Sequence, residues 1–222
     1  MCRRASNFAR SVETPPPIVI AIIDYGAGNL RSVTKGLQAA GASCVVTDKL
    51  NDIERARAIV IPGVAAASDT MCGLRSRGLV EPIRYAIDSG KPFLGICMGL
   101  QALMTFSVEG DGEPCMDVLH GPVLKLPHGL KVPHMGWNQV RVRRPDSWLM
   151  DGIPDEADFY FVHSFYAVPD DASTIVADTE YGVRFASVVL RDTIAATQFH
   201  PEKSGRWGLS LLRNFVRFAG EG

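Results

Sequence analysis

The sequence predicts an α/β fold with a mostly parallel central sheet flanked by helices, to which the second half of the chain adds antiparallel strands. Two observations support this prediction. Over residues 18–106, short runs rich in Val and Ile alternate with segments of helical periodicity, as in parallel sheets that are covered on both faces. From about Val118 onward, strand-like runs follow one another without long helices between them.

The elements of the first half are expected in the order strand, helix, strand, strand, helix, strand, helix. Strands are expected over residues 18–24, 43–47, 58–62 and 92–96, and helices over residues 29–41, 79–90 and 98–106. Glycine closes the first two helices, as is common just after a helix. In the second half, strands are expected over residues 123–127, 138–144, 158–168, 173–178, 184–190 and 193–199, and a last helix over residues 208–219.

Length and composition fit one domain over residues 18–222, preceded by an extension over residues 1–17. The chain has 222 residues, of which 46% are hydrophobic and 21% are charged, as in ordinary globular proteins. The first 17 residues contain three arginines before their first acidic residue and end in three prolines. This composition favours a disordered extension over a transit peptide.

Charge balance and cysteine pattern limit the classes of partner. With 23 Lys and Arg against 24 Asp and Glu, the net charge is −1, which predicts binding neither to nucleic acid nor to a membrane surface. The five cysteines include no C-x-x-C pair, which argues against a disulfide framework or zinc site and fits a reducing cytoplasm. His120, His128 and His163 lack metal-ligand spacing, so we expect no metal and no cofactor.

Cys97 stands where a buried strand is expected to turn into a helix, in the sequence GICMG. This is the position of a nucleophile elbow, here with cysteine in place of serine. Gly95 and Gly99 fit it, because a sharp turn leaves no room for side chains two residues on either side. The helix start favours a thiolate and offers free N–H groups to an oxyanion. By itself, however, the motif equally fits a small buried cysteine.

A cysteine nucleophile needs a base, and His200 is the best candidate among the five histidines. It follows a late expected strand, and Glu202 lies two residues further on. The strand period of two predicts that both side chains lie on one face, where Glu202 would orient the ring of His200. Cys97, His200 and Glu202 are therefore the expected catalytic triad.

With these residues in place, GICMGLQ and QFHPEKSG resemble the class I glutamine amidotransferase family, whose members hydrolyse glutamine and pass the ammonia to a second site. The resemblance runs from about Ile18 to the C-terminus and implies a flavodoxin-like fold. Within the family, IDYGAGNLRSV, IPGV, VPHMGWNQV and YFVHSFY are similar to the glutaminase subunits of imidazole glycerol phosphate synthases in histidine biosynthesis. PHMGWN is the most specific of these motifs.

The resemblance implies that Cys97 attacks L-glutamine, that His200 moves the protons and that a glutamyl thioester forms. It places the oxyanion on backbone N–H groups of Met98 and of the loop at Val64 and Ala65. The family usually has glycine at the position of Ala65. Because a Cβ restricts φ, we expect Ala65 to alter how readily the oxyanion hole forms, not whether it forms.

The resemblance also implies a substrate site and a partner. It assigns glutamine binding to Gly63, Gln101, Glu109, Ser164 and Phe165, with Glu109 near the end of the expected helix over residues 98–106. The partner is a (β/α)₈ barrel cyclase, which forms a heterodimer with this chain and makes imidazole glycerol phosphate and aminoimidazole carboxamide ribonucleotide. The residues implied on that interface are Asn29, His134, Trp137, Asn138 and Lys203.

Other functions remain open at this stage. A paralogous glutaminase would supply ammonia to a different synthase, such as a nucleotide-sugar amidotransferase, and the partner that stimulates hydrolysis would distinguish it. A catalytically silent subunit with the same fold is disfavoured by the intact Cys97, His200 and Glu202. A cysteine peptidase is disfavoured because neither the papain-like nor the caspase-like signature is present.

Overall fold

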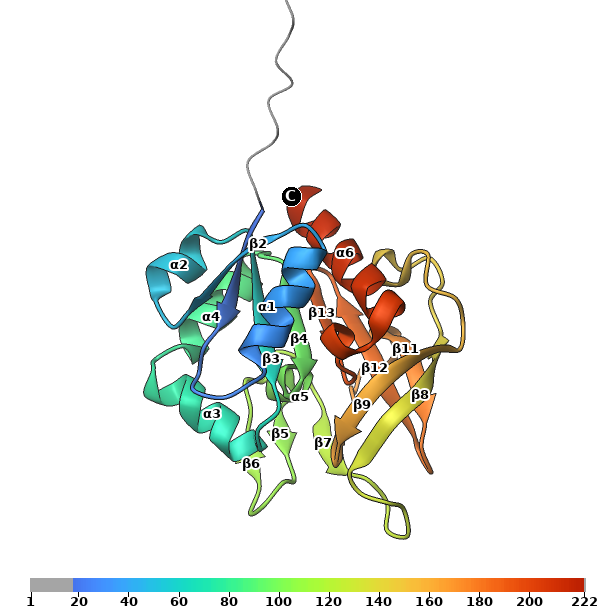
Figure 1. The fold of residues 1–222 in the computed structure, drawn as a ribbon. Helices are drawn as coiled ribbons and strands as arrows, with labels where there is room; N and C mark the ends of the chain where they lie inside the picture. Colours follow the sequence, from blue (N-terminus) through green and yellow to red (C-terminus); the bar gives the residue numbers. More distant parts are fainter. Residues whose placement is uncertain (1–17, 222) are drawn as a thin grey trace, which may run out of the picture.

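The computed structural model describes residues 18–221, so the expected extension over residues 1–17 lies outside the described part. A nine-stranded sheet forms the centre of the molecule (Figure 1). Its order is β2 (Ser43–Thr47), β1 (Val19–Ile23), β3 (Ala58–Gly63), β4 (Phe93–Cys97), β13 (Ile194–Thr197), β12 (Arg184–Arg191), β11 (Ile175–Glu180), β8 (His134–Val142), β9 (Ala157–His163). The pairs from β2–β1 to β4–β13 are parallel, and the pairs from β13–β12 to β8–β9 are antiparallel. The expected fold class is confirmed.

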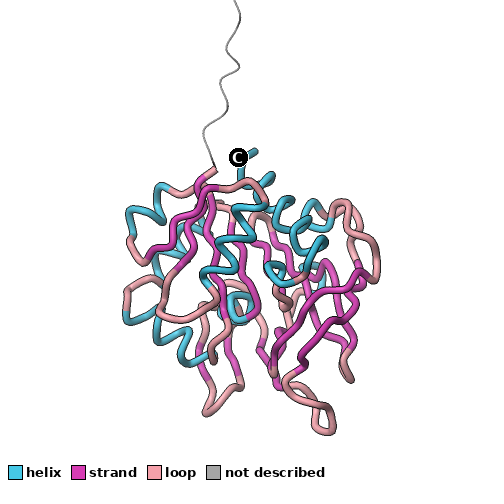
Figure 2. Tube along the Cα trace, viewed as in Figure 1, coloured by secondary structure: helices cyan, strands magenta, loops and turns pink. Residues whose placement is uncertain are grey.

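Helices cover both faces of the sheet (Figure 2). The apolar residues of α1 (Leu30–Ala39) and α6 (Gly205–Glu221) join one core, on the face seen in front in Figure 1. The apolar residues of four further helices join the other core: α2 (Leu50–Arg55), α3 (Ala67–Ser76), α4 (Val80–Asp88), α5 (Met98–Leu103). None of the helices between residues 18 and 221 has the length and apolar character of a membrane-spanning segment.

Strand β3 shows how the sequence builds the two cores. Ala58 and Val60 point into the first core, whereas Ile59 and Ile61 point into the second, because successive side chains of a strand face opposite sides. A strand buried on both faces must be apolar at every position, which explains the unbroken Val and Ile runs in the sequence.

The expected helix over residues 98–106 is wrong beyond Leu103. Helix α5 ends there, Met104 is extended, and Phe106 starts a short strand. This strand belongs to a second, four-stranded sheet in the order β10 (Phe165–Ala167), β7 (Pro122–Lys125), β5 (Phe106–Ser107), β6 (Glu113–Pro114). Pairing of Phe106 with Pro114 on one side and Pro122 on the other explains the change, since helical periodicity alone does not reveal such partners.

Three other expectations need correction. The expected strand over residues 158–168 is two strands, β9 and β10, which belong to different sheets and are separated by Ser164. Strand β8 begins at His134, so PHMGWN is largely strand, earlier than the expected start at residue 138. Helices α2 and α3 were not expected. The structure also contains short 3-10 helices: η1 (Trp148–Met150), η2 (Ala172–Thr174), η3 (Pro201–Lys203).

Candidate active site

The carboxyl ends of three neighbouring parallel strands meet at the candidate site. Strand β4 ends at Cys97 and lies between β3, which ends at Gly63, and β13, which leads to His200. Ligands of open α/β sheets bind at this edge of the sheet. The sheet order therefore places the nucleophile between the loop at Val64 and the candidate base.

Cys97 adopts a strained backbone with φ 53° and ψ −100° directly before α5. A Cβ added to Gly95 would lie 2.6 Å from the carbonyl oxygen of Gly99, and one added to Gly99 would lie 2.1 Å from that of Ile61. Both distances are too short for any side chain, which confirms the steric reason for the two glycines. The turn places the thiol at the carboxyl edge of the sheet by bringing β3, β4 and α5 into backbone contact.

The expected contact between His200 and Glu202 is present, but its geometry differs from the expectation. His200 Nδ1 and Glu202 Oε1 are 2.9 Å apart, and both side chains are 1% exposed. Strand β13 ends at Thr197, and Pro201 starts the 3-10 helix η3, so the strand period does not place Glu202. Ser204 anchors this segment, because its Oγ donates to the His200 carbonyl at 2.6 Å and accepts from the Tyr160 N–H at 2.9 Å.

The Cys97 thiol is held by two groups besides the triad. Its Sγ donates to the Val162 carbonyl at 3.9 Å and accepts from Nε2 of Gln198 at 3.5 Å. Nε2 of His200 is buried and makes no hydrogen bond. Burial lowers the pKa of His200, but Cys97 and Glu202 outweigh it and raise this pKa to about 9. At neutral pH the His200 ring is therefore an imidazolium, the charge that would attract a thiolate nucleophile.

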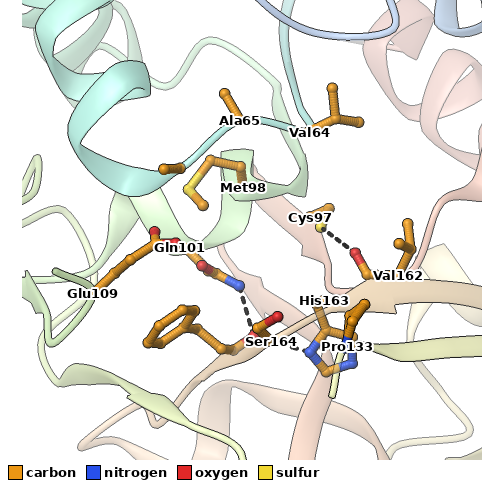
Figure 3. A pocket seen from close by; sticks show the side chains of 12 residues that line it. Val64, Ala65, Cys97, Met98, Gln101, Glu109, Pro133, Val162, His163 and Ser164 are labelled. Atoms are coloured by element: carbon orange, nitrogen blue, oxygen red, sulfur yellow. Dashed lines mark hydrogen bonds between the residues drawn. The ribbon is translucent and has the colours of Figure 1, made fainter. Parts of the chain in front are cut away.

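A cavity of about 240 Å³ opens beside Cys97 (Figure 3). It is smaller than the roughly 300–1,000 Å³ typical of drug-sized ligands and so fits a small molecule. Its lining comes from five parts of the chain: Val64, Ala65, Ala66, Cys97, Met98, Gln101, Glu109, Pro133, Val162, His163, Ser164, Phe165. Gly63 does not line it, since the Gly63 Cα packs beneath the Met98 side chain.

Glu109 and Gln101 lie on one side of this cavity (Figure 3). The Glu109 Oε2 accepts a hydrogen bond from the Ala67 N–H, 2.6 Å away, at the start of α3. The expectation that Glu109 lies near the end of α5 is wrong, because this helix ends six residues earlier, at Leu103. The hydrogen bond from the start of α3 holds the Glu109 carboxylate instead. Gln101 Nε2 donates to the Phe165 carbonyl at 2.8 Å, and its Oε1 is buried without a partner.

His134 and His163 form a directed hydrogen-bond chain behind the cavity. The Phe165 carbonyl only accepts, so Nδ1 of His163, 2.9 Å away, carries a proton. Burial lowers the pKa of His163 to about 3 and that of His134 to about 4, so both rings are neutral. His163 Nε2 must then accept from Nδ1 of His134 at 2.9 Å, and His134 Nε2 accepts from Asn138 at 3.2 Å.

Of the residues implied at the partner interface, Trp137 and Lys203 lie close together, whereas His134 is buried. Trp137 on β8 is 58% exposed, whereas His134 is only 3% exposed and does not present its ring to a partner. The ring of Trp137 lies 6.0 Å from that of Tyr160, over which the Lys203 ammonium lies at 5.9 Å. Asn29 precedes α1, at the carboxyl end of β1.

Two residues that contact the Cys97 thiol were missed by sequence reasoning. Gln198 is fully buried and contacts both Cys97 and Gln101, and Val162 supplies the carbonyl that faces the thiol. A fully buried amide two residues before the candidate base was the available signal for Gln198, but no pattern indicates a backbone contact such as that of Val162. Among residues 18–221, no three His, Cys, Asp or Glu side chains are grouped to hold a metal ion.

The fold and the cysteine site have a counterpart among known families. The profile of the family described as glutamine amidotransferase class-I matches residues 21–218. The chain therefore belongs to the class I glutamine amidotransferase family. Among its relatives, "Imidazole glycerol phosphate synthase subunit HisH" of Dehalococcoides mccartyi is 48% identical over 201 residues, covering 90% of this chain and 98% of the relative. The protein of that name from Moorella thermoacetica is 50% identical over 204 residues, covering 90% of this chain and 97% of the relative.

Solved structures agree on the fold. A putative GMP synthase protein from Thermoplasma acidophilum superposes with a TM-score of 0.69 at 22% identity, covering 93% of this chain and 96% of that one. PurLQS from Thermotoga maritima gives a TM-score of 0.72 at 20% identity, covering 91% and 99%. At these identities the likeness concerns the fold alone, and it matches the expected amidotransferase fold.

Proposed function

We propose that this chain is the glutaminase subunit of an imidazole glycerol phosphate synthase, which hydrolyses L-glutamine and supplies ammonia to a cyclase subunit. The observation that carries the proposal is the Cys97 elbow beside a His200–Glu202 pair, with a small cavity in front of the thiol. Relatives that carry this subunit name match about nine tenths of the chain. They favour histidine biosynthesis over a paralogous nucleotide-sugar amidotransferase.

In the first half of the reaction, the Cys97 thiolate attacks the carboxamide carbon of glutamine. The imidazolium of His200 gives its Nε2 proton to the leaving nitrogen, and ammonia departs from a glutamyl thioester. In the second half, neutral His200 takes a proton from water, which attacks the thioester and releases glutamate. Glu202 holds Nδ1 of the ring at 2.9 Å throughout, so that Nε2 remains the atom that exchanges protons.

The tetrahedral intermediates require donors for a developing oxyanion. The Met98 N–H lies in the first turn of α5, where backbone N–H groups lack intrahelical partners. The facing loop at Val64 and Ala65 lines the same cavity and is the proposed source of a second donor. One such donor is typically worth about 3 kcal/mol in the transition state.

Substrate recognition follows from the charges in the cavity. The Glu109 carboxylate and the unpaired Oε1 of Gln101 would accept from the α-ammonium of glutamine. Backbone N–H groups of Ser164 and Phe165, beside Gln101, would bind the α-carboxylate and orient the substrate. A bound glutamine would thereby point its carboxamide toward Cys97.

The proposal also covers a partner and a location. Asn29, Trp137, Asn138 and Lys203 would contact a (β/α)₈ barrel cyclase in a cytoplasmic heterodimer, and ammonia would pass through a sheltered channel to its lyase site. A channel is required because ammonia released into water protonates and loses its nucleophilicity.

The test is a glutaminase assay of three mixtures: the chain alone, the chain with the cyclase, and both with a nucleotide ligand of the cyclase. We expect slow turnover alone, large stimulation in the last mixture, and loss of all turnover in Cys97→Ala. Equal hydrolysis in the three mixtures would contradict the assignment to this synthase, because it would identify a free-standing glutaminase.

A further inference from the structure

Gln198 is a buried amide that the proposed reaction does not use. It stands in the sequence between the end of β13 at Thr197 and His200, and its side chain is fully buried. Its Nε2 donates to Cys97 Sγ at 3.5 Å, and its Oε1 accepts from Nε2 of Gln101 at 3.2 Å. A buried amide costs free energy unless its polar atoms are paired, and here one of the partners is the nucleophile itself.

The value of this contact depends on the charge of the sulfur. A neutral thiol is a weak acceptor, so the bond to Gln198 contributes little while Cys97 is protonated. A thiolate makes the same bond charge-assisted and shorter. The Val162 carbonyl acts in the opposite direction, because it accepts the S–H proton at 3.9 Å and so favours the neutral thiol.

We propose that the Gln198 amide is a further catalytic residue, which stabilises the Cys97 thiolate by donating a hydrogen bond to it. On ionisation the S–H bond breaks, its electron pair remains on sulfur, and the proton moves to Nε2 of His200. Gln198 keeps both of its amide protons throughout. The proposal rests on the proposed function, because that function makes Cys97 the nucleophile.

The other titratable groups around Cys97 do not replace this donor. Tyr25 interacts with Cys97, but burial raises the pKa of its hydroxyl to about 12, and that hydroxyl donates to the Pro62 carbonyl. His163 is neutral, since burial lowers its pKa to about 3. Glu109 in the same cavity carries the charge that disfavours a thiolate. His200 and Gln198 are thus the two side chains around the sulfur that favour it.

Gln101 suggests a second consequence of the same amide. Because Gln101 donates to Gln198 Oε1 and to the Phe165 carbonyl, Gln198 joins the nucleophile to the wall that binds the substrate. Loss of the donor to Cys97 and loss of the contact with Gln101 can therefore be separated without adding a charge. Gln198→Met removes both contacts, whereas Gln101→Met removes only the contact with Gln101 and leaves the Gln198 N–H on the sulfur.

The experiment measures alkylation of Cys97 by iodoacetamide as a function of pH, with modification quantified on the Cys97 peptide by mass spectrometry. Exposed Cys72 is the internal reference within the same chain. We expect alkylation of Cys97 at pH 7 to slow about tenfold in Gln198→Met, with the profile displaced to higher pH, as for loss of a hydrogen bond to a charged group. The displacement is expected to be absent from Gln101→Met, which keeps that hydrogen bond. Alkylation of Cys72 is expected to stay unchanged.

Asn214→Leu is the matched control for loss of a buried amide, because Asn214 donates to the carbonyls of Leu149 and Asp151, far from the thiol in sequence and on α6. It is expected to lower stability without moving the Cys97 profile. Equal displacement in Gln101→Met and Gln198→Met would overturn the proposal, since the Gln101 contact would then explain the effect. Wild-type profiles in both variants would overturn it as well. Glutamine hydrolysis is measured separately, so failure of the proposed function leaves this readout intact.

Discussion

At the scale of single residues, the charge on His200 sets how the site works. Its pKa of about 9 lies above the ordinary value of 6.5 because Cys97 and Glu202 outweigh burial. A folded-state pKa above the unfolded value means that protonation stabilises the folded protein. This contribution is fully present below pH 6.5 and is lost as the pH rises through about 9.

Glu202→Gln tests this charge balance. The amide keeps the shape of the carboxylate but removes its charge, so we expect the pKa of His200 to fall and kcat to drop by about 10²–10⁴-fold. Glutamine hydrolysis over a range of pH measures the rate, and NMR titration of the ring measures the pKa. An unchanged kcat would show that Glu202 does not orient the base.

The stability of the same variant provides the control. Urea unfolding of the wild type is expected to show a declining free energy of unfolding as the pH rises from 7 to above 9, with the sign given by the raised pKa of His200. The decline is expected to be smaller and to begin at lower pH in Glu202→Gln. Identical curves for both proteins would contradict the coupling between the two side chains.

At the scale of elements, the turn from β4 to α5 depends on its two glycines. Gly99→Ala would place a Cβ 2.1 Å from the Ile61 carbonyl oxygen, so the backbone of α5 or of β3 would have to shift. We expect a loss of about 3 kcal/mol in the free energy of unfolding, measured with urea, since overpacking of a core typically costs about 1–3 kcal/mol.

Gly36→Ala is the matched comparison for that glycine. Its Cβ would meet the end of the flexible Leu212 side chain at 2.9 Å, and alanine favours the helix that contains it. We expect a change smaller than about 1 kcal/mol. Equal losses in the two variants would show that the turn has no special steric demand.

The loop at Ala65 is the second element that invites a test. The backbone φ of Ala65 is not positive, so the present conformation of the loop does not require glycine at this position. Ala65→Gly widens the range of φ that the loop can adopt. We expect hydrolysis by the chain alone to rise about two- to fivefold, because glycine-to-alanine differences in backbone free energy of about 0.4–1 kcal/mol correspond to rate factors of this size. Basal and stimulated rates identical to those of the wild type would contradict this expectation.

Elements with a strong local pattern were predictable from the sequence, and elements set by distant contacts were not. The buried strands β1, β3 and β4 follow directly from their Val and Ile runs, because both of their faces are covered. The end of α5 at Leu103 depends on sheet partners such as Pro114 and Pro122, which no local pattern reveals. The pairing of His200 with Glu202 was correctly expected for the wrong reason, since a 3-10 turn and not a strand brings them together.

At the scale of the whole molecule, a hydrogen-bond chain joins strand β8 to the wall of the cavity. It runs from Asn138 on β8 through His134 and His163 to the Phe165 carbonyl, which also binds Gln101. The motif PHMGWN was visible in the sequence, but this connection was not. Its hydrogen bonds pass from β8 to β9 through side chains that are far apart in the sequence. Strand β8 is thereby linked physically to the substrate wall.

Trp137→Ala tests whether the β8 surface contacts a partner. Trp137 is 58% exposed, so its removal costs the isolated chain little stability and leaves hydrolysis by the chain alone unchanged. We expect stimulation by the cyclase to fall about tenfold or more, since aromatic anchors of interfaces are typically worth about 2 kcal/mol. Tyr85→Ala is the control, because Tyr85 on α4 is 77% exposed and lies outside this surface. Equal effects of the two substitutions would contradict an interface at β8.

The central claim is that Cys97 forms a glutamyl thioester during glutamine hydrolysis. The most direct measurement is rapid acid quenching of the wild-type chain during turnover, followed by mass spectrometry of its peptides. The expected result is a glutamyl adduct on the Cys97 peptide, absent from Cys97→Ala and from samples without glutamine. Hydrolysis that persists in Cys97→Ala, or an adduct on another residue, would contradict the claim.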